Sequence, residues 1–300
     1  MRVTLTLLVA AALLGAAGWW VSAPDPLPAA ALAGVTGDAE RGAALFAMAG
    51  CESCHRAPDD QGGEGPPVLS GGRAFLSEFG TFHAPNISPS PQGIGDWTDA
   101  EIIQATMRGV SPLGAHYYPA FPYPAYRLAA VQDVADIAAF LRTLPESDAP
   151  NRPHEVGFPF NIRRGIGLWK ALFLRDDFVL QGDLEPAVER GRYLVEALAH
   201  CGECHTPRNA LGALDRSRWL GGAPNPSGPG RIPNITPGVL TWTEEEIALY
   251  LQSGFTPVFD VAGGEMAEVI RSNTSRMTDE DRRAIAAYLK AVPPVAPPAP

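Results

Sequence analysis

The sequence predicts an all-α protein built from two similar modules, and three observations support this prediction. Apolar residues recur at intervals of three and four in several segments, which is the period of an amphipathic helix. No segment shows the alternation of apolar and polar residues that is typical of a half-buried strand. The same features also occur twice in the same order, 145 to 150 residues apart. A duplicated helical module is the simplest explanation.

The internal repeat extends from the beginning of each module to its last helix. Six pairs of segments match in order: 40–42 with 189–191, 51–55 with 201–205, 71–72 with 221–222, 86–89 with 234–237, 97–102 with 242–247, and 133–145 with 281–293. We therefore place one domain at residues 34–150 and a second at residues 186–293.

Each module is expected to contain three helices. The first leads into a cysteine-containing motif. The second begins after an N-cap threonine, Thr98 or Thr243, and the acidic residues of its first turn suit the helix dipole. The third covers approximately residues 131–144 and 279–292 and is ended by proline. In the second module, Thr278 is its expected N-cap.

Two further segments lie outside the modules. Residues 151–185 contain many apolar residues, among them Trp169 and Phe173, and this composition is atypical of a free linker. We expect the segment to pack between the modules, and the alternative is that it faces a partner or a membrane surface. Residues 294–300 are rich in proline and are expected to be disordered.

The N-terminus is apolar from Val3 to Val21, which is long enough to cross a bilayer. Trp19 and Trp20 lie where an interfacial aromatic belt would be, and this favours a retained anchor. Residues 31–33, Ala-Leu-Ala, offer a cleavage pattern that favours a removed signal peptide. Both interpretations make residues 1–33 an anchor or signal segment and export the rest of the chain, to the periplasmic side of a bacterial inner membrane.

Composition and charge exclude some classes of partner. The formal net charge is −10 and the isoelectric point is near 5.1, so nucleic acid is excluded as a partner because phosphate binding needs clustered Lys and Arg. The 30 prolines and 31 glycines predict many loops. All four cysteines fall inside two short motifs, which leaves none for a structural disulfide.

Each module contains one Cys-x-x-Cys-His motif, at residues 51–55 and 201–205. Cysteines at i and i+3 lie on one side of a helical turn, so both thiols can bond to one porphyrin while the next histidine binds its iron. A zinc site or a thioredoxin-like redox pair would not explain a histidine after both pairs, and no βαβ pattern surrounds them. The motifs predict two covalently bound haem c groups. The thioether anchors would be Cys51, Cys54, Cys201 and Cys204, and the proximal iron ligands His55 and His205.

The second haem has a candidate ligand for the other face of its iron. Met266 lies in a loop twelve residues before the third helix of the second module, and a thioether in that position raises the potential of a haem iron. The alternative is that Met266 only packs. Met277 is a weaker candidate, because it directly precedes a helix N-cap.

The first haem lacks an equivalent ligand. The 145-residue offset carries Met266 back to Phe121, which cannot bind iron. His116 in the same loop is our expected sixth ligand, and an open or water-bound iron is an alternative. The other candidates are Met107, which has a helical position typical of the core, and His83.

Three motifs, at residues 118–123, 201–209 and 263–269, resemble those of bacterial di- and trihaem c-type cytochromes. These proteins are similar to the cytochrome subunits of membrane-associated alcohol, gluconate and fructose dehydrogenases. The resemblance covers residues 38–293 and implies two tandem class I cytochrome c-like haem domains. It also implies a separate dehydrogenase subunit that supplies electrons, which pass to quinone, another cytochrome or an oxidase. Many relatives place methionine where this chain has Phe121.

The functional hypotheses differ in whether a substrate is transformed. The first is an electron relay that is not an enzyme by itself and has no catalytic residue. The alternative is a haem enzyme, peroxidase-like or thiosulfate-oxidising, which would use the unusually ligated first haem. A redox or gas sensor would need an output domain, which the sequence does not show.

Overall fold

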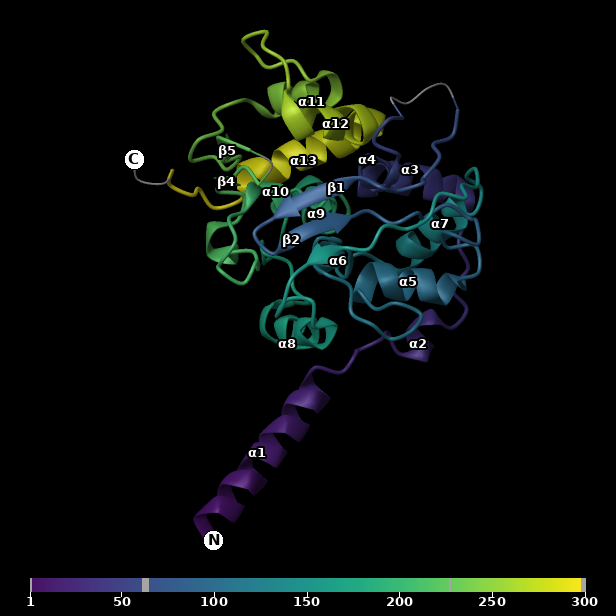
Figure 1. Ribbon diagram of the computed structural model, residues 1–300. Helices are drawn as coiled ribbons and strands as arrows, with labels where there is room; N and C mark the ends of the chain where they lie inside the picture. Colours follow the sequence, from purple (N-terminus) through teal and green to yellow (C-terminus); the bar gives the residue numbers. More distant parts are fainter. Residues whose placement is uncertain (1, 61–64, 227, 298–300) are drawn as a thin grey trace.

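The computed structural model describes residues 2–60, 65–226 and 228–297, and is mostly helical. Helix α1 (Arg2–Val21) projects from a body that contains the other described elements (Figure 1). Within the described part of the chain, α1 is the one helix long and apolar enough to cross a membrane. The short helix α2 (Ala29–Leu32) follows it.

The two modules have the same order of helices. The first contains α3 (Ala39–Ala49), α4 (Cys51–His55), α5 (Asp99–Arg108), α6 (Tyr123–Tyr126) and α7 (Val131–Leu141). The second contains α9 (Pro186–Tyr193), a π-helical segment (Leu194–Leu198), α10 (Gly202–His205), α11 (Glu244–Ser253), α12 (Gly264–Ser272) and α13 (Asp279–Ala291). Two single-turn 3₁₀ helices, Arg216–Arg218 and Thr274–Arg276, complete the second module.

The predicted helix starts are confirmed at the level of individual hydrogen bonds. Thr98 and Thr243 each accept a bond from the backbone of the glutamate three residues later, whose side chain bonds back to the threonine backbone. Such a capping box satisfies two N–H groups that the helix cannot pair internally. Thr278 accepts from the backbone N–H of Asp281 at the start of α13, as predicted.

A glycine at the first helix of each module lets two helices cross in close contact. A Cβ on Gly42 would lie 2.0 Å from the carbonyl oxygen of Asp136 in α7. A Cβ on Gly191 would lie 1.9 Å from the carbonyl oxygen of Ala284 in α13. The recurrence of Glu-Arg-Gly in both modules therefore has a physical reason, because any side chain at the glycine would push the crossing helices apart.

Short strands are present that the sequence pattern did not predict. Strands β1 (Ala74–Ser77), β2 (Gly80–His83) and β3 (Glu155–Val156) form an antiparallel sheet in the order β1-β2-β3. Strands β4 (Ala223–Pro224) and β5 (Arg231–Ile232) pair in the second module. The description all-α therefore holds only for the main elements, since strands of two to four residues are too short to show alternation.

Buried apolar residues form a cluster that spans both modules and another that lies within the first module. One cluster joins Met48, Ile103 and Met107 of the first module to Leu194 and Leu198 of the second. Tyr193 of α9 adds a polar contact, because its hydroxyl donates to the Asp133 carboxylate at 2.5 Å. The modules are thus parts of one packed body.

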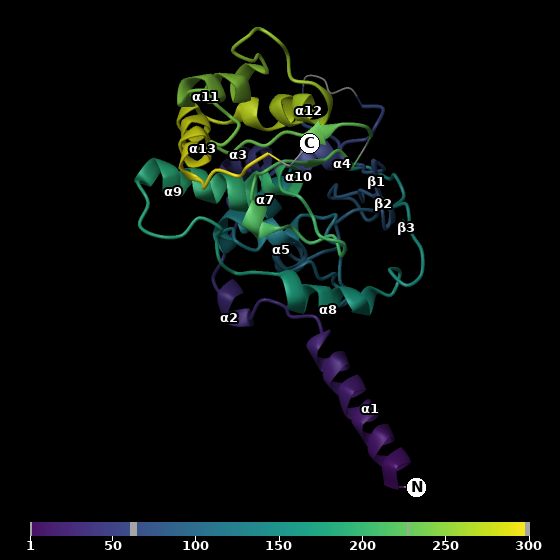
Figure 2. The same cartoon turned by 90° about the vertical axis from the view of Figure 1, so that its left-hand side faces the viewer.

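The segment between the modules packs as predicted. Its helix α8 (Arg163–Phe173) contacts both modules, because Lys170 Nζ donates to the carbonyl of Arg108 at 2.6 Å and Trp169 Nε1 donates to that of Leu211 at 2.8 Å. Figure 2 shows α8 lying across the end of the body from which α1 projects.

The beginning of the proline-rich tail is ordered, which differs from the prediction of disorder from residue 294. The backbone N–H of Val295 donates to Thr236 at 3.0 Å, and its carbonyl accepts from Asn234 at 2.8 Å. Two hydrogen bonds and a contact with Gly221 outweigh the composition at this point. Residues 298–300 lie outside the described residues.

The glycine crossings lead to a prediction about stability. We expect Gly42→Ala and Gly191→Ala each to lower the free energy of unfolding by about 1–3 kcal/mol, because the added methyl overpacks a helix contact. Gly165→Ala in α8 is the matched control, since its Cβ would meet nothing within 4 Å. Guanidinium unfolding followed by circular dichroism measures all three, and an unchanged midpoint in both crossing variants would contradict the prediction.

Candidate haem-binding sites

The histidine of each motif has the same backbone partner. His55 Nδ1 lies 2.8 Å from the carbonyl oxygen of Pro85, and His205 Nδ1 lies 2.8 Å from that of Pro233. A carbonyl oxygen only accepts, so Nδ1 must carry the proton. The lone pair is then on Nε2, which is the arrangement found when histidine binds a metal. The donor set therefore fits a proximal ligand in both modules.

The electrostatics of the motifs agree with this arrangement. Burial lowers the pKa of His55 and His205, which keeps both imidazoles neutral and able to bind iron. Burial raises the pKa of the free Cys51 and Cys201 thiols to about 12. No group of three or more His, Cys, Asp or Glu residues that could hold a metal ion occurs among the described residues.

A glycine turn brings the motif helix to its proline. The backbone N–H of Gly71 donates to the carbonyl of His55 at 2.7 Å, and that of Gly222 donates to the carbonyl of His205 at 2.7 Å. Gly71 has a φ of 71°, and a Cβ there would lie 2.4 Å from the carbonyl carbon of Pro85. Only glycine allows this approach. The repeated Gly-Gly pairs of the sequence therefore belong to the histidine-binding turn.

Sequence reasoning missed Pro85 and Pro233, because a backbone carbonyl leaves no side-chain signature. The available signal was the Pro-Asn-Ile sequence that follows the glycine pair in both modules. Asn86 and Asn234 each accept a hydrogen bond from the backbone N–H two residues later, at 2.9 and 2.8 Å. These side chains fix the turn that aims the proline carbonyl.

The distal loops of the two modules have the same frame but different residues at the ligand position. Residues 110 and 116 pair as an isolated β-bridge, and residues 255 and 261 do the same. Five residues after each bridge lie Phe121 and Met266. Phe121 packs edge-on against three tyrosines, Tyr117, Tyr123 and Tyr126. Met266 lies in the first turn of α12, partly buried against the shared core.

His116, the predicted sixth ligand of the first haem, faces the N-terminal segment. Its Nε2 lies 2.9 Å from the carbonyl oxygen of Ser22, and its side chain is buried. A Cβ on Gly167 of α8 would be 2.8 Å from the same nitrogen. Its Nδ1 is buried and has no hydrogen-bond partner among the described residues, so the bond from Nε2 to Ser22 leaves the lone pair of Nδ1 available for a metal.

The two weaker candidates for the first haem also have other partners. His83 lies in β2, with its Nε2 3.4 Å from the Glu155 carboxylate. Met107 is buried in the core that the modules share. Met107 thus has a packing role, whereas His83 pairs through Nε2 and keeps a buried Nδ1 without a hydrogen-bond partner among the described residues.

The two motif helices lie close together at the module boundary. The carbonyl oxygen of Ala49 accepts from His200 Nε2 at 3.3 Å and from the Tyr126 hydroxyl at 2.5 Å. The His200 and Tyr126 rings pack edge to face at 5.4 Å. The charge of Cys54 contributes to the raised pKa of Cys204, about 11, after the larger effects of burial and Glu203. The motifs of the two modules are therefore neighbours.

His200 occupies a backbone conformation that favours glycine. Its φ is 41°, and Gly50 at the equivalent position of the first module has a φ of 70°. A non-glycine residue in this region costs about 1–2 kcal/mol. The imidazole of His200 crosses the module boundary from this strained position.

Ion pairs hold the same boundary. The buried carboxylate of Glu52 pairs with Arg276 of the second module at 2.7 Å and with Arg56 of its own module at 2.6 Å. Arg73 pairs with Glu265, the residue before Met266, at 2.5 Å. The distal helix α12 of the second module is thus fixed beside the motif helix of the first.

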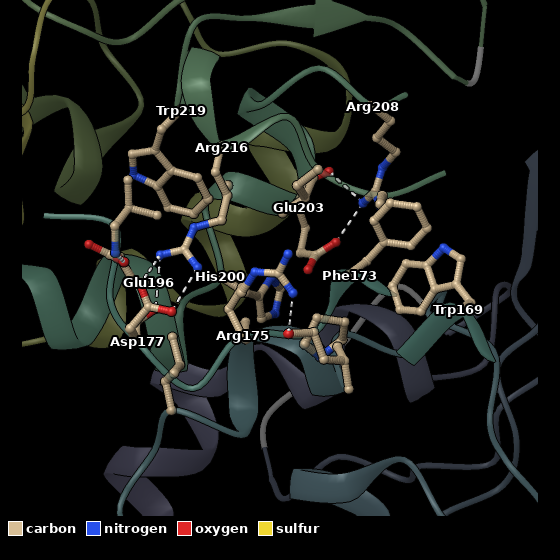
Figure 3. Close-up of a pocket in the computed structure, with 18 residues that line it drawn as sticks. Trp169, Phe173, Arg175, Asp177, Glu196, His200, Glu203, Arg208, Arg216 and Trp219 are labelled. Atoms are coloured by element: carbon tan, nitrogen blue, oxygen red, sulfur yellow. Dashed lines mark hydrogen bonds and ion pairs between the residues drawn. The ribbon is translucent and has the colours of Figure 1, made fainter. Parts of the chain in front are cut away.

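A small cavity lies between α8 and the second module (Figure 3). Trp169, Phe173, Glu196, His200 and Trp219 are among its lining residues. Its volume of about 80 Å³ is far below the roughly 300–1,000 Å³ of a small-molecule site. Gly202 and Glu203 of the second motif also line it, so the cavity adjoins the second haem motif.

The sequence is similar to those of known cytochromes c. The family model for cytochrome c matches residues 39–145 and 188–293. A dihaem cytochrome c-type protein of Cereibacter sphaeroides is 56% identical over 297 residues, which cover 98% of this chain and 100% of that protein. The cytochrome subunit of a fructose dehydrogenase from Gluconobacter japonicus is 38% identical over 84% of this chain and 52% of its own length.

A third relative is the cytochrome c subunit of a quinone alcohol dehydrogenase from Gluconobacter oxydans, 34% identical over 85% of this chain. The chain spans about half the length of these two dehydrogenase subunits. Both matched family segments contain one Cys-x-x-Cys-His motif, and two cytochrome c domains imply two covalently bound c-type haems. This chain belongs to the cytochrome c family and carries two cytochrome c domains in tandem.

Proposed function

We propose that this dihaem cytochrome c relays electrons on the periplasmic side of a bacterial inner membrane. A partner dehydrogenase would supply the electrons, which pass to quinone, another cytochrome or an oxidase. The observation that carries this proposal is the pair of identical histidine-to-proline bonds, in two motifs that meet at one boundary. Relatives that are subunits of dehydrogenases support the relay role.

The proposal gives each motif residue a defined task. Cys51 and Cys54 would anchor the first haem, and Cys201 and Cys204 the second. His55 and His205 would bind iron through Nε2, while their Nδ1–H groups are held by Pro85 and Pro233. Bound haem supplies one-electron chemistry at its iron.

The chain offers a short connection between the two motifs. Cys51 is joined through Gly50 to Ala49, and His200 is joined directly to Cys201. The hydrogen bond from His200 to the Ala49 carbonyl joins these two segments. Covalent bonds interrupted by one hydrogen bond therefore link the two anchoring cysteines.

Unequal distal residues give the relay a direction. Met266 is proposed as the sixth ligand of the second haem, which raises the potential of that iron. Phe121 at the equivalent position of the first module provides no ligand. Electrons would therefore tend to move from the first domain to the second.

Phe121 also supports the alternative function, a haem enzyme with an exchangeable position at the first iron. Such an enzyme needs a polar distal residue and an iron that binds external ligands. If the purified protein binds neither cyanide nor carbon monoxide at the first haem, this alternative is excluded.

The methionine assignment predicts a change in one potential. We expect Met266→Ala to lower the potential of one haem by more than about 59 mV, a tenfold change in a one-electron equilibrium, because a thioether ligand is lost. A redox titration followed at the haem absorption bands measures both waves. The reciprocal variant Phe121→Met should raise the potential of the other haem. Two unshifted waves in Met266→Ala would remove Met266 as a ligand.

His116 gives a spectroscopic prediction. We expect His116→Ala to convert the first haem to high spin, because we propose the unpartnered Nδ1 of His116 as its sixth ligand. Hydrogen exchange around residues 19–24 should also become faster, because the bond to Ser22 is lost. Optical and electron paramagnetic resonance spectra report the spin state, with His83→Ala as the matched control. An unchanged low-spin spectrum in the His116 variant would remove His116 as the sixth ligand of the first haem.

The connection through His200 predicts a change in rate. We expect His200→Gly to slow electron equilibration between the haems several-fold, because the imidazole contact is lost while glycine keeps the backbone at positive φ. Pulse radiolysis measures this rate. Unchanged potentials of both haems in a redox titration would show that the driving force for electron transfer between them is unaltered. The control His200→Gln keeps a side-chain donor. An unchanged rate in His200→Gly would exclude this path.

A further inference from the structure

Helix α8 turns its basic residues toward the protein. Arg163 Nη1 donates to the carbonyl of His116 at 2.8 Å, and Arg164 Nε donates to Ser22 Oγ at 2.8 Å. Lys170 Nζ donates to backbone carbonyls at the end of α5, at 2.6 and 2.8 Å. The three basic side chains of this helix therefore form hydrogen bonds within the protein.

The opposite face of α8 and its entry are apolar and exposed. Ile162, Leu168 and Leu172 keep 51%, 43% and 60% of their surface exposed, and Gly165 and Ala171 are exposed beside them. A surface helix of a globular protein normally has the reverse arrangement, with its apolar stripe toward the core. Exposure of this apolar face of α8 to water is therefore unfavourable.

Neighbouring segments extend this apolar face. Phe158 and Phe160, just before α8, are 82% and 45% exposed. Leu113 is 96% exposed at the tip of the loop that ends at His116, whose carbonyl Arg163 binds. We call these three residues, together with Ile162, Leu168 and Leu172, the outer apolar surface. Large apolar residues exposed together on and around one helix indicate an interaction site.

The end of α1 lies against α8. Arg164 stacks on the Trp19 ring at 4.1 Å and also donates to the Trp19 carbonyl. Gly167 meets the chain just after α1, since a Cβ there would lie 2.2 Å from the carbonyl oxygen of Ser22. Trp19 and Trp20 are 68% and 79% exposed, and aromatic residues of this kind gather at the membrane interface. These contacts place α8 at the depth where α1 would leave a bilayer.

We propose that α1 is retained as an anchor and that the outer apolar surface lies in the interfacial layer of the same bilayer. Figure 2 shows α8 crosswise to α1, at the end of the body from which α1 projects. An in-plane helix buries its apolar face at the boundary of headgroups and acyl chains. The basic residues of α8 do not face the lipid headgroups. They instead hold the end of α1 and the loop of His116 against the body. The proposal rests on the membrane location in the proposed function and adds the face that contacts lipid.

Lipid crosslinking in the full-length holoprotein tests the proposal. The protein is reconstituted into vesicles of phosphatidylethanolamine and phosphatidylglycerol that contain a lipid with a photoactivatable acyl chain. We expect crosslinks in α1 and also in residues 158–172, located by peptide mass spectrometry. Leu168→Glu combined with Leu172→Glu should abolish the second set and keep the first.

Leu249→Glu is the matched control, because Leu249 is 56% exposed in α11 at the end of the body opposite α1 (Figure 1). It should leave both sets of crosslinks unchanged. Crosslinks confined to α1 would overturn the proposal and would assign the surface to a protein partner instead. An intact mass that lacks α1 would overturn it too, since α1 places α8 at the bilayer. The rate between the haems tests the relay function separately, so failure of one proposal does not imply failure of the other.

Discussion

The hydrogen bond from the motif histidine to a proline carbonyl is the interaction around which each module is built. It requires Nδ1 to keep its proton, and so leaves Nε2 for iron. It also requires the chain to return close to the motif helix, and the turn at Gly71 permits this close approach. The turn at Asn86 orients the proline carbonyl toward the histidine. The helix crossings at glycine then fix the frame that holds both turns. Because the same set of contacts occurs twice, the two halves of the sequence repeat fold into the same arrangement around the motif histidine.

One extra residue makes the two modules unequal at their boundary. The spacing from the crossing glycine to the first motif cysteine is nine residues between Gly42 and Cys51, and ten between Gly191 and Cys201. The π-helical segment Leu194–Leu198 accommodates this insertion within the helix. The chain then reaches His200 in the conformation that Gly50 adopts in the first module. The side chain at this position can therefore reach Ala49 across the boundary.

Local signals made much of this architecture predictable. The N-caps Thr98 and Thr243, the helical periodicity and the spacing of the haem motifs all act within a few residues, so the sequence shows them directly. The carbonyl of Pro85, the sheet pairing of β2 with β3 and the π-helical segment depend on backbone geometry or on distant segments. For the same reason, the pattern identified His116 as a loop histidine but did not show that Ser22, 94 residues away, is its partner.

The two distal loops differ in the surroundings of the second bridge residue. The bridge position that is His116 in the first module is Val261 in the second, and Val261 is 62% exposed. In the first module this position is buried against Ser22 and α8, so the loop serves to hold the N-terminal segment. The second module keeps its loop free and retains a methionine at the ligand position. The two loops therefore differ in two respects: the first contacts the chain next to α1, and the second has the methionine that we propose as an iron ligand. With Met266 as the proposed ligand, electrons would move from the first domain, near α1, to the second domain.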